Sequence, residues 1–170
     1  TGFPGTPYIL FALADNGHAD TAYKMLLNTQ CPSWLYEVRV GATTVWERWD
    51  GLDENGECPI GDDGTDMMIS YNHYASGAVG AFLYRRVLGV EPTEAGYRKF
   101  KFAPVVGGGI TEAEGTVGTP YGVIKAAWKI ADGEMTMTVA VPVGTECTVV
   151  LPSGEEKVLA SGEYTVTAKA

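Results

Sequence analysis

The period of the apolar pattern changes once along this chain, near residues 91–96, and this change limits the folds that the chain can adopt. Before it, apolar residues recur at i, i+3, i+4 and i+7, the spacing of an amphipathic helix, as in residues 19–27. After Pro92, apolar and polar residues alternate, as in residues 124–130, which is typical of a strand. We therefore predict an α+β fold with two domains, residues 1–92 and residues 93–170.

The first domain is predicted to contain three helices, over residues 8–14, 19–27 and 72–89. Between the second and third helices, residues 32–71 lack helical spacing. The aromatic and β-branched residues of the first half of this stretch favour a hairpin, and the second half reads as a polar loop. Three such helices are too few to bury their own apolar faces, so we expect them to pack against further helices. The chain is thus expected to be a piece of a longer protein.

The second domain is predicted to be an antiparallel β-sandwich of six or seven short strands. Ile124, Ala126, Trp128 and Ile130 share one strand face, and the next strand alternates from Met135 to Val141. Asp132-Gly133 lies between these two strands, and this dipeptide favours a two-residue hairpin turn.

Charge and composition exclude several classes of function. The chain has 12 Lys and Arg residues against 21 Asp and Glu residues, a formal charge of −9, and no basic cluster. A nucleic acid or an anionic membrane surface would repel such a chain. Three scattered cysteines without metal-ligand spacing predict no zinc site. We expect no nucleic-acid partner, no membrane partner, no metal and no cofactor.

The segment 41–50, with the sequence GATTVWERWD, is the densest candidate for chemistry. If it is extended, Val45, Glu47 and Trp49 share a face. A carboxylate flanked by apolar side chains is poorly solvated, which makes it a stronger base. An aromatic ring beside it can stack on a sugar. The alternative is an ordinary Glu–Arg pair at the surface of a strand that carries core tryptophans.

Two neighbouring features are weaker candidates. Residues 50–66 carry seven acidic side chains and no Lys or Arg, but their spacing does not match a calcium-binding loop, so we expect a solvated loop. His73 begins a predicted helix, where the dipole favours the neutral imidazole, which can bond a sugar hydroxyl. A capping or packing histidine is the alternative.

Four segments in this order resemble the C-terminal part of bacterial α-L-rhamnosidases, which are inverting glycoside hydrolases with an (α/α)6 barrel. They are residues 1–7 (TGFPGTP), 32–36 (PSWLY), 41–49 (GATTVWERW) and 72–75 (NHYA). The tail, with Phe102-Ala103-Pro104 and Tyr121-Gly122, resembles the β-sandwich that follows the barrel. The resemblance implies the terminal helices of such a barrel followed by a sandwich.

By this resemblance, Glu47 matches the general base, His73 lines the sugar pocket, and Trp49 supports the base or stacks on the sugar. The substrates would be rhamnose-containing glycosides or oligosaccharides. The general acid would come from an upstream barrel segment, so the chain alone should not turn over substrate. If it did, Asp50, Asp62, Asp63 and Asp66 would become candidates for the acid.

Two other functions remain open from the sequence. The chain could be a non-catalytic carbohydrate-binding or interaction module with residues 93–170 as its working part. That function calls for a row of exposed aromatic residues, whereas Trp128 fits a core face and Tyr97, Tyr121 and Tyr164 are scattered. A glycosidase of the same barrel fold with another sugar specificity is the third possibility.

Overall fold

The computed structural model of the chain describes residues 1–61, 64–65 and 67–170. It contains two compact units, Thr1–Gly80 and Ala81–Ala170, which we describe separately. No helix within the described residues is long and apolar enough to cross a membrane. The domain division at residues 92 and 93 stays a prediction from the sequence.

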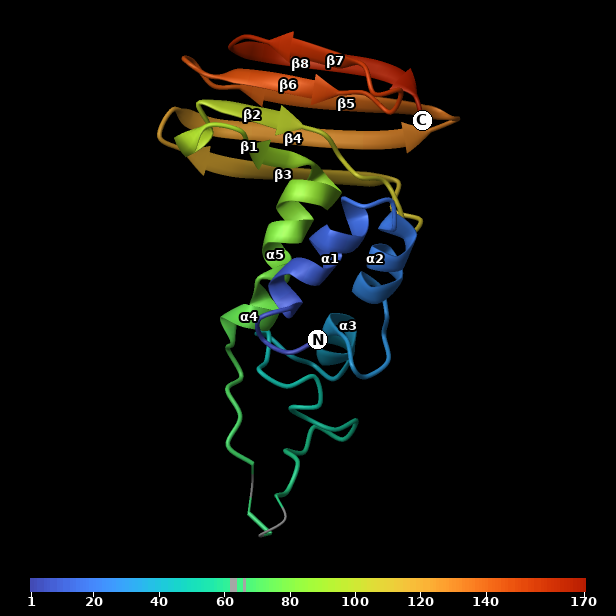
Figure 1. The fold of residues 1–170 in the computed structure, drawn as a ribbon, viewed down its shortest axis with the longest axis vertical. Coiled ribbons are helices and arrows are strands. Elements are labelled where there is room, and N and C mark those ends of the chain that lie inside the picture. The colour runs from blue at the N-terminus through green and yellow to red at the C-terminus, as the bar shows by residue number, and fades with distance from the viewer. Residues whose placement is uncertain (62–63, 66) are drawn as a thin grey trace. The chain divides into compact units, whose positions relative to one another are not determined.

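The first unit is helical. It contains α1 (Thr6–Ala14), α2 (Ala19–Leu26), α3 (Trp34–Arg39) and α4 (Tyr74–Gly77). Helix α1 lies against α2 and α4, as Figure 1 shows. The apolar stripe predicted for residues 19–27 is confirmed at Ala22, Tyr23 and Leu26 of α2, which are buried, whereas Leu27 follows the helix and is exposed.

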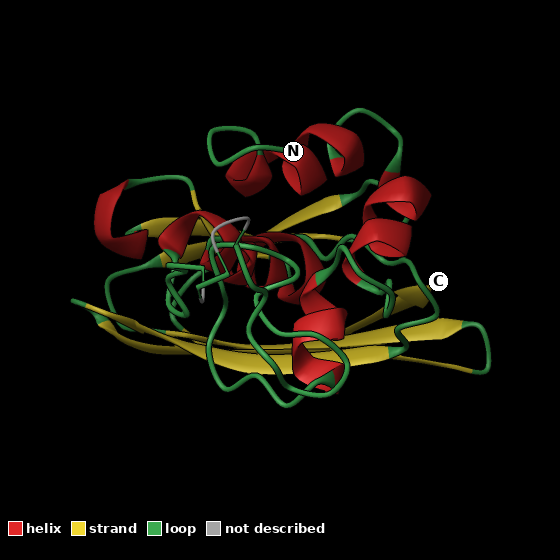
Figure 2. Ribbon diagram, turned by 90° about the horizontal axis from the view of Figure 1, so that it is seen from below, coloured by secondary structure: helices red, strands yellow, loops and turns green. Residues whose placement is uncertain are grey.

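The prediction of a hairpin in the first half of residues 32–71 is wrong. Residues 34–39 form helix α3, and residues 42–49 belong to neither helix nor strand. Ser33 determines the start of the helix, because its hydroxyl accepts a hydrogen bond of 3.0 Å from the Tyr36 N–H and so caps it. The described residues between α3 and α4 form loops and turns, apart from a single bridge residue, Ile60 (Figure 2, loops in green).

The predicted third helix is present but interrupted. Its predicted start was residue 72, whereas its first helical residue is Tyr74, with His73 as the cap. It comprises α4, α5 (Val79–Phe82) and a π-helical segment, η1 (Leu83–Leu88). Gly89 ends it, as predicted, in a left-handed conformation with φ of 92°. A Cβ atom at Gly89 would lie 2.3 Å from the Pro104 nitrogen, so the position requires glycine.

The second unit is a β-sandwich of two four-stranded sheets. One sheet has the order β1-β2-β6-β7 and the other β3-β4-β5-β8, and in Figure 1 the first overlies the second. A short 3-10 helix, η2 (Ala95–Tyr97), joins β1 to β2. The strands are β1 (Val90–Pro92), β2 (Lys99–Phe102), β3 (Glu112–Thr119), β4 (Gly122–Ala131), β5 (Glu134–Val141), β6 (Glu146–Val150), β7 (Glu156–Leu159) and β8 (Gly162–Lys169).

The alternating residues supply the core of the sandwich, as predicted. Ile124, Ala126 and Trp128 of β4 pack with Met135 and Met137 of β5 between the sheets. Asp132 and Gly133 both have positive φ, 51° and 78°, and form the predicted two-residue turn. Two details differ from the expected sandwich: the described residues form eight strands, and β2 pairs with β6 in parallel.

Candidate functional site

Two of the three predicted site residues line one hollow of the helical unit, and the third contacts a residue of its wall. Glu47 and Trp49 are half-buried and line a hollow of about 240 Å³. His73 does not line this hollow, but its ring stacks on Phe3, which does, with ring centres 4.6 Å apart. The remaining lining residues are Thr1, Gly2, Thr6, Arg48, Asp50 and Ser76.

Reciprocal hydrogen bonds hold Glu47 against Ser70. The Glu47 N–H donates to the Ser70 carbonyl, and the Ser70 N–H donates to Oε2 of Glu47, both at 2.9 Å. A backbone N–H that bonds a carboxylate fixes its orientation with a charge-assisted bond. The carboxyl group therefore has a defined direction at the edge of the hollow.

His73 caps a helix and lies beside the site as well. Its ring Nδ1 accepts a bond of 3.4 Å from the Ala75 N–H, and its backbone N–H donates to the Val45 carbonyl at 2.9 Å. Because Nδ1 accepts, the neutral ring carries its proton on Nε2. The imidazole, between Phe3 and Tyr74, can thus donate a hydrogen bond through Nε2.

Trp49 is supported from within the unit. Its ring meets the Trp34 ring edge to face, with centres 5.0 Å apart. The Trp34 indole N–H donates to the Ser76 carbonyl at 2.9 Å and so ties both rings to α4. Trp49 and Phe3 give the hollow the aromatic surface that a sugar ring can stack on.

Arg48 pairs with Asp50. The guanidinium donates to both carboxylate oxygens of Asp50, at 2.9 and 2.8 Å. These hydrogen bonds lower the pKa of Asp50 and keep it ionised, so it is a poor candidate for a general acid. The other acidic candidates, Asp62, Asp63 and Asp66, lie outside the described residues.

The described part of the acidic stretch is a loop with local turns. Asp53 accepts bonds from the N–H groups of Asn55 and Glu57, both at 2.8 Å, and Glu54 pairs with Arg39 at 2.8 Å. The backbone bond from Glu57 is the main cause that lowers the pKa of Asp53. Within the described residues, no group of three or more His, Cys, Asp or Glu side chains could hold a metal ion.

Sequence reasoning missed Glu37, a buried acid behind the site. Its side chain is 2% exposed, and its Oε2 accepts the Trp46 N–H at 3.1 Å. Burial raises its pKa from the ordinary 4.5 to about 7, although the bond from Trp46 opposes the shift. The sequence signal was the i, i+3 spacing from Trp34, which puts both side chains on one face if residues 34–39 are helical.

Glu37 makes a definite contribution to the pH dependence of stability. The folded chain holds a proton on Glu37 between pH 4.5 and about 7, where the unfolded chain releases it. Its contribution therefore falls as the pH rises through this window. The free energy of unfolding of Glu37→Gln, measured relative to that of the wild type, should therefore rise by about 2–3 kcal/mol from pH 5 to pH 8. Urea unfolding at both pH values measures this gain.

The matched control for that experiment is Glu54→Gln. Glu54 is a loop residue whose side chain is 71% exposed, and it pairs with Arg39, which lies in α3 with Glu37. The pH dependence of this variant should follow the wild type closely, because an exposed pair contributes little. A Glu37→Gln variant that loses stability relative to the wild type between pH 5 and pH 8 would contradict the burial of a protonated Glu37.

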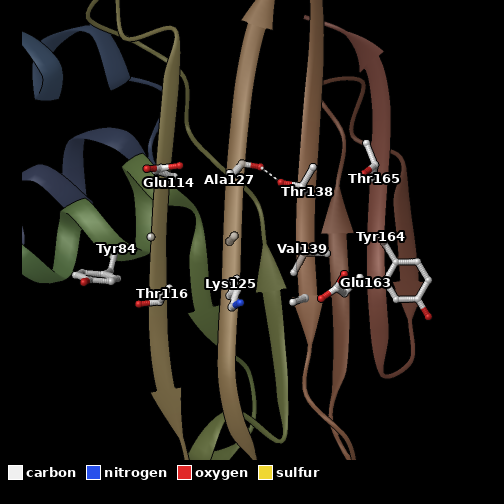
Figure 3. Close-up of a pocket in the computed structure, with 13 residues that line it drawn as sticks. Tyr84, Glu114, Thr116, Lys125, Ala127, Thr138, Val139, Glu163, Tyr164 and Thr165 are labelled. Atoms are coloured by element: carbon white, nitrogen blue, oxygen red, sulfur yellow. Dashed lines mark hydrogen bonds between the residues drawn. The ribbon is translucent and has the colours of Figure 1, made fainter.

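The sandwich unit has a wide, shallow hollow over one sheet. It measures about 920 Å³ and lies on strands β3, β4, β5 and β8 (Figure 3). Its aromatic lining residues are Tyr84 and Tyr164, which lie at opposite edges in Figure 3, and Thr, Glu and Lys side chains fill the space between them. Trp128 is buried in the core beneath. The surface thus lacks the continuous aromatic platform that a carbohydrate-binding sheet would present.

The helical unit holds a carboxylate beside aromatic rings, and a β-sandwich follows it along the chain. Residues 1–87 match the family model described as the bacterial alpha-L-rhamnosidase 6 hairpin glycosidase domain. Residues 89–165 match the model of the bacterial alpha-L-rhamnosidase C-terminal domain. The chain therefore belongs to the bacterial α-L-rhamnosidase family, as the sequence motifs predicted.

Curated relatives and solved structures agree with this assignment. The chain is 38% identical over 160 residues to an α-L-rhamnosidase of Formosa agariphila and 40% identical over 153 residues to one of Streptomyces avermitilis. These matches cover 94% and 90% of this chain, but only 17% and 14% of the two relatives. The chain thus spans about a sixth of their length.

The solved structures show the same fold. The native α-L-rhamnosidase of Aspergillus terreus superposes with a TM-score of 0.89 at 38% identity, covering 98% of this chain and 19% of that one. The Streptomyces avermitilis α-L-rhamnosidase complexed with L-rhamnose gives a TM-score of 0.87 at 34% identity, covering 99% of this chain and 18% of that one.

Proposed function

We propose that the chain is the C-terminal part of a longer inverting glycoside hydrolase that removes terminal α-L-rhamnosyl groups. In this enzyme it supplies the general base, Glu47. The observation that carries the proposal is the fixed carboxyl group of Glu47 beside the aromatic hollow, in a chain whose relatives are named α-L-rhamnosidases. The L-rhamnose in the structure of the Streptomyces relative supports the choice of sugar.

Each site residue has a distinct role in this mechanism. Glu47 takes a proton from water, which attacks the anomeric carbon from the face opposite the leaving group. The Nε2–H group of His73 donates to a sugar hydroxyl. Trp49, held by Trp34, presents its ring to the apolar face of the sugar or supports the base. The reaction needs two carboxyl groups and a water molecule, and no cofactor.

The general acid is proposed to come from an upstream segment of the (α/α)6 barrel. Inversion requires an acid about 6.5–9.5 Å from the base, so that water fits between the base and the sugar. Within the described residues, Asp50 lines the hollow with Glu47 but is held ionised by Arg48. The upstream barrel segment is therefore the partner of this chain, and rhamnose-containing glycosides or oligosaccharides are its substrates.

The test is hydrolysis of p-nitrophenyl α-L-rhamnoside by a protein extended upstream with the coding sequence of its own gene. The extended protein should release p-nitrophenol and rhamnose. The 170-residue chain should release neither, because the proposed general acid belongs to the upstream segment. Activity of the short chain would refute the assignment of the acid to an upstream segment.

A further inference from the structure

The peptide group that joins Val45 to Trp46 is held from both sides. Its carbonyl accepts the His73 N–H at 2.9 Å, and its N–H donates to Oε2 of Glu37 at 3.1 Å. One end of the same rigid peptide plane therefore bonds the backbone of a site residue, and the other end bonds a buried acid on α3. Glu47 is the next residue along the chain.

The Trp46 side chain anchors this segment but leaves its backbone to other groups. The ring is 2% exposed and meets the Tyr71 ring edge to face, with centres 5.5 Å apart. Gly51 packs so closely on the ring that a Cβ atom there would lie 2.8 Å from it. These contacts fix the ring, whereas the orientation of the peptide plane depends on its hydrogen bonds to Glu37 and His73.

A buried carboxyl group such as that of Glu37 lowers the stability of the fold more than a neutral hydrogen-bond acceptor would. Oε1 of Glu37 is buried and has no hydrogen-bond partner among the described residues. A buried oxygen without a partner lowers stability, and a buried carboxyl group is costly in either protonation state. A buried polar group of this kind calls for an explanation, and the hydrogen bond that its other oxygen accepts from the Trp46 N–H supplies one.

We propose that Glu37 is a positioning residue of the site. Its carboxyl group holds the Val45–Trp46 peptide from the side opposite His73 and thereby sets Glu47 and His73 at their working separation. Glu37 does not line the hollow, so it acts through the peptide that it holds. Its effect on the rate rests on the proposed function, whereas its hydrogen bond to the Trp46 N–H can be tested without that function.

The test compares two substitutions of Glu37 that differ in one respect. Glu37→Gln keeps an oxygen that can accept the Trp46 N–H, whereas Glu37→Leu has a similar size and no acceptor. Glu54→Gln, on the exposed partner of Arg39, is the control. Each is made in the upstream-extended protein and in the 170-residue chain, with Glu47→Gln beside them.

In the extended protein, Glu37→Leu should lower kcat per folded molecule by about 10- to 100-fold, because displacing a reacting group by about 1 Å can have an effect of this size. KM should change by less than about threefold, and Glu37→Gln and Glu54→Gln should retain kcat within about threefold. Equal losses in the Gln and Leu variants, or a full kcat in the Leu variant, would overturn the proposal.

Amide hydrogen exchange in the 170-residue chain supplies a readout that does not depend on activity. The amides of Trp46 and His73 should exchange at least about 10-fold faster in Glu37→Leu than in Glu37→Gln, while sandwich amides such as that of Val139 keep their rates. Unchanged exchange at both amides would overturn the proposal. If the extended wild type were inactive, the proposed function would fail, and exchange alone would decide whether Glu37 holds the peptide.

Discussion

Replacing Glu47 by Gln in the upstream-extended protein is expected to lower kcat by about 10²–10⁴-fold, the usual contribution of a general base. The amide of Gln can still accept the Ser70 N–H through its oxygen, so the loop should keep its conformation. It cannot take a proton from water, so the loss should fall on kcat, with little change in KM. Steady-state hydrolysis of p-nitrophenyl α-L-rhamnoside measures both constants.

The control for this experiment is a carboxylate that lies near Glu47 in the sequence but does not line the hollow, Glu54. Glu54→Gln removes an exposed charge from the loop that follows Glu47, and it should leave kcat and KM near the wild-type values. A Glu47→Gln variant with a kcat close to that of the wild type would show that another group activates the water.

Trp128→Ala is expected to lower the free energy of unfolding of the sandwich by about 3–5 kcal/mol. Trp128 is 2% exposed at the centre of β4, packed between the two sheets, and its indole N–H donates to the Val87 carbonyl at 2.8 Å. Truncation leaves a cavity of nearly the whole ring and a buried carbonyl without its donor. Urea unfolding followed by the circular dichroism of the sheets measures the loss.

Lys129→Ala provides the matched comparison on the same strand. Lys129 points to the outer face and pairs with Glu112 at 2.8 Å, where both side chains are more than 60% exposed. Its replacement should change the free energy of unfolding by about 0.5 kcal/mol or less. Comparable losses in the two variants would contradict the placement of Trp128 in the core.

The sandwich could be predicted because residues close together in the sequence determine its strands and their turns. Alternation identifies the inward faces of β4 and β5, and Asp132-Gly133 determines the turn between them. The parallel pairing of β2 with β6 could not be predicted in this way. It joins Phe100 to Cys147 across a long separation in sequence, and the period of either strand carries no information about its partner.

The helical unit was harder to predict, because its aromatic residues favour a strand by composition where the structure has a helix. Trp34, Leu35 and Tyr36 suit a strand by composition, but the Ser33 cap makes them a helix. Glu47 and Trp49 could be singled out as candidate site residues from their motif, and both line the hollow. The stacking of His73 on Phe3 and the bond from Trp46 to Glu37 depend on the tertiary fold, which no local pattern encodes.

The most direct test of the central claim is the anomeric form of the rhamnose first released from an α-L-rhamnoside by the upstream-extended protein. Proton NMR during the first turnovers distinguishes the anomers before they equilibrate. If Glu47 activates water opposite the leaving group, the β-anomer should appear first. The α-anomer first would mean retention, which requires a nucleophilic carboxylate in place of a base and would contradict the role proposed for Glu47.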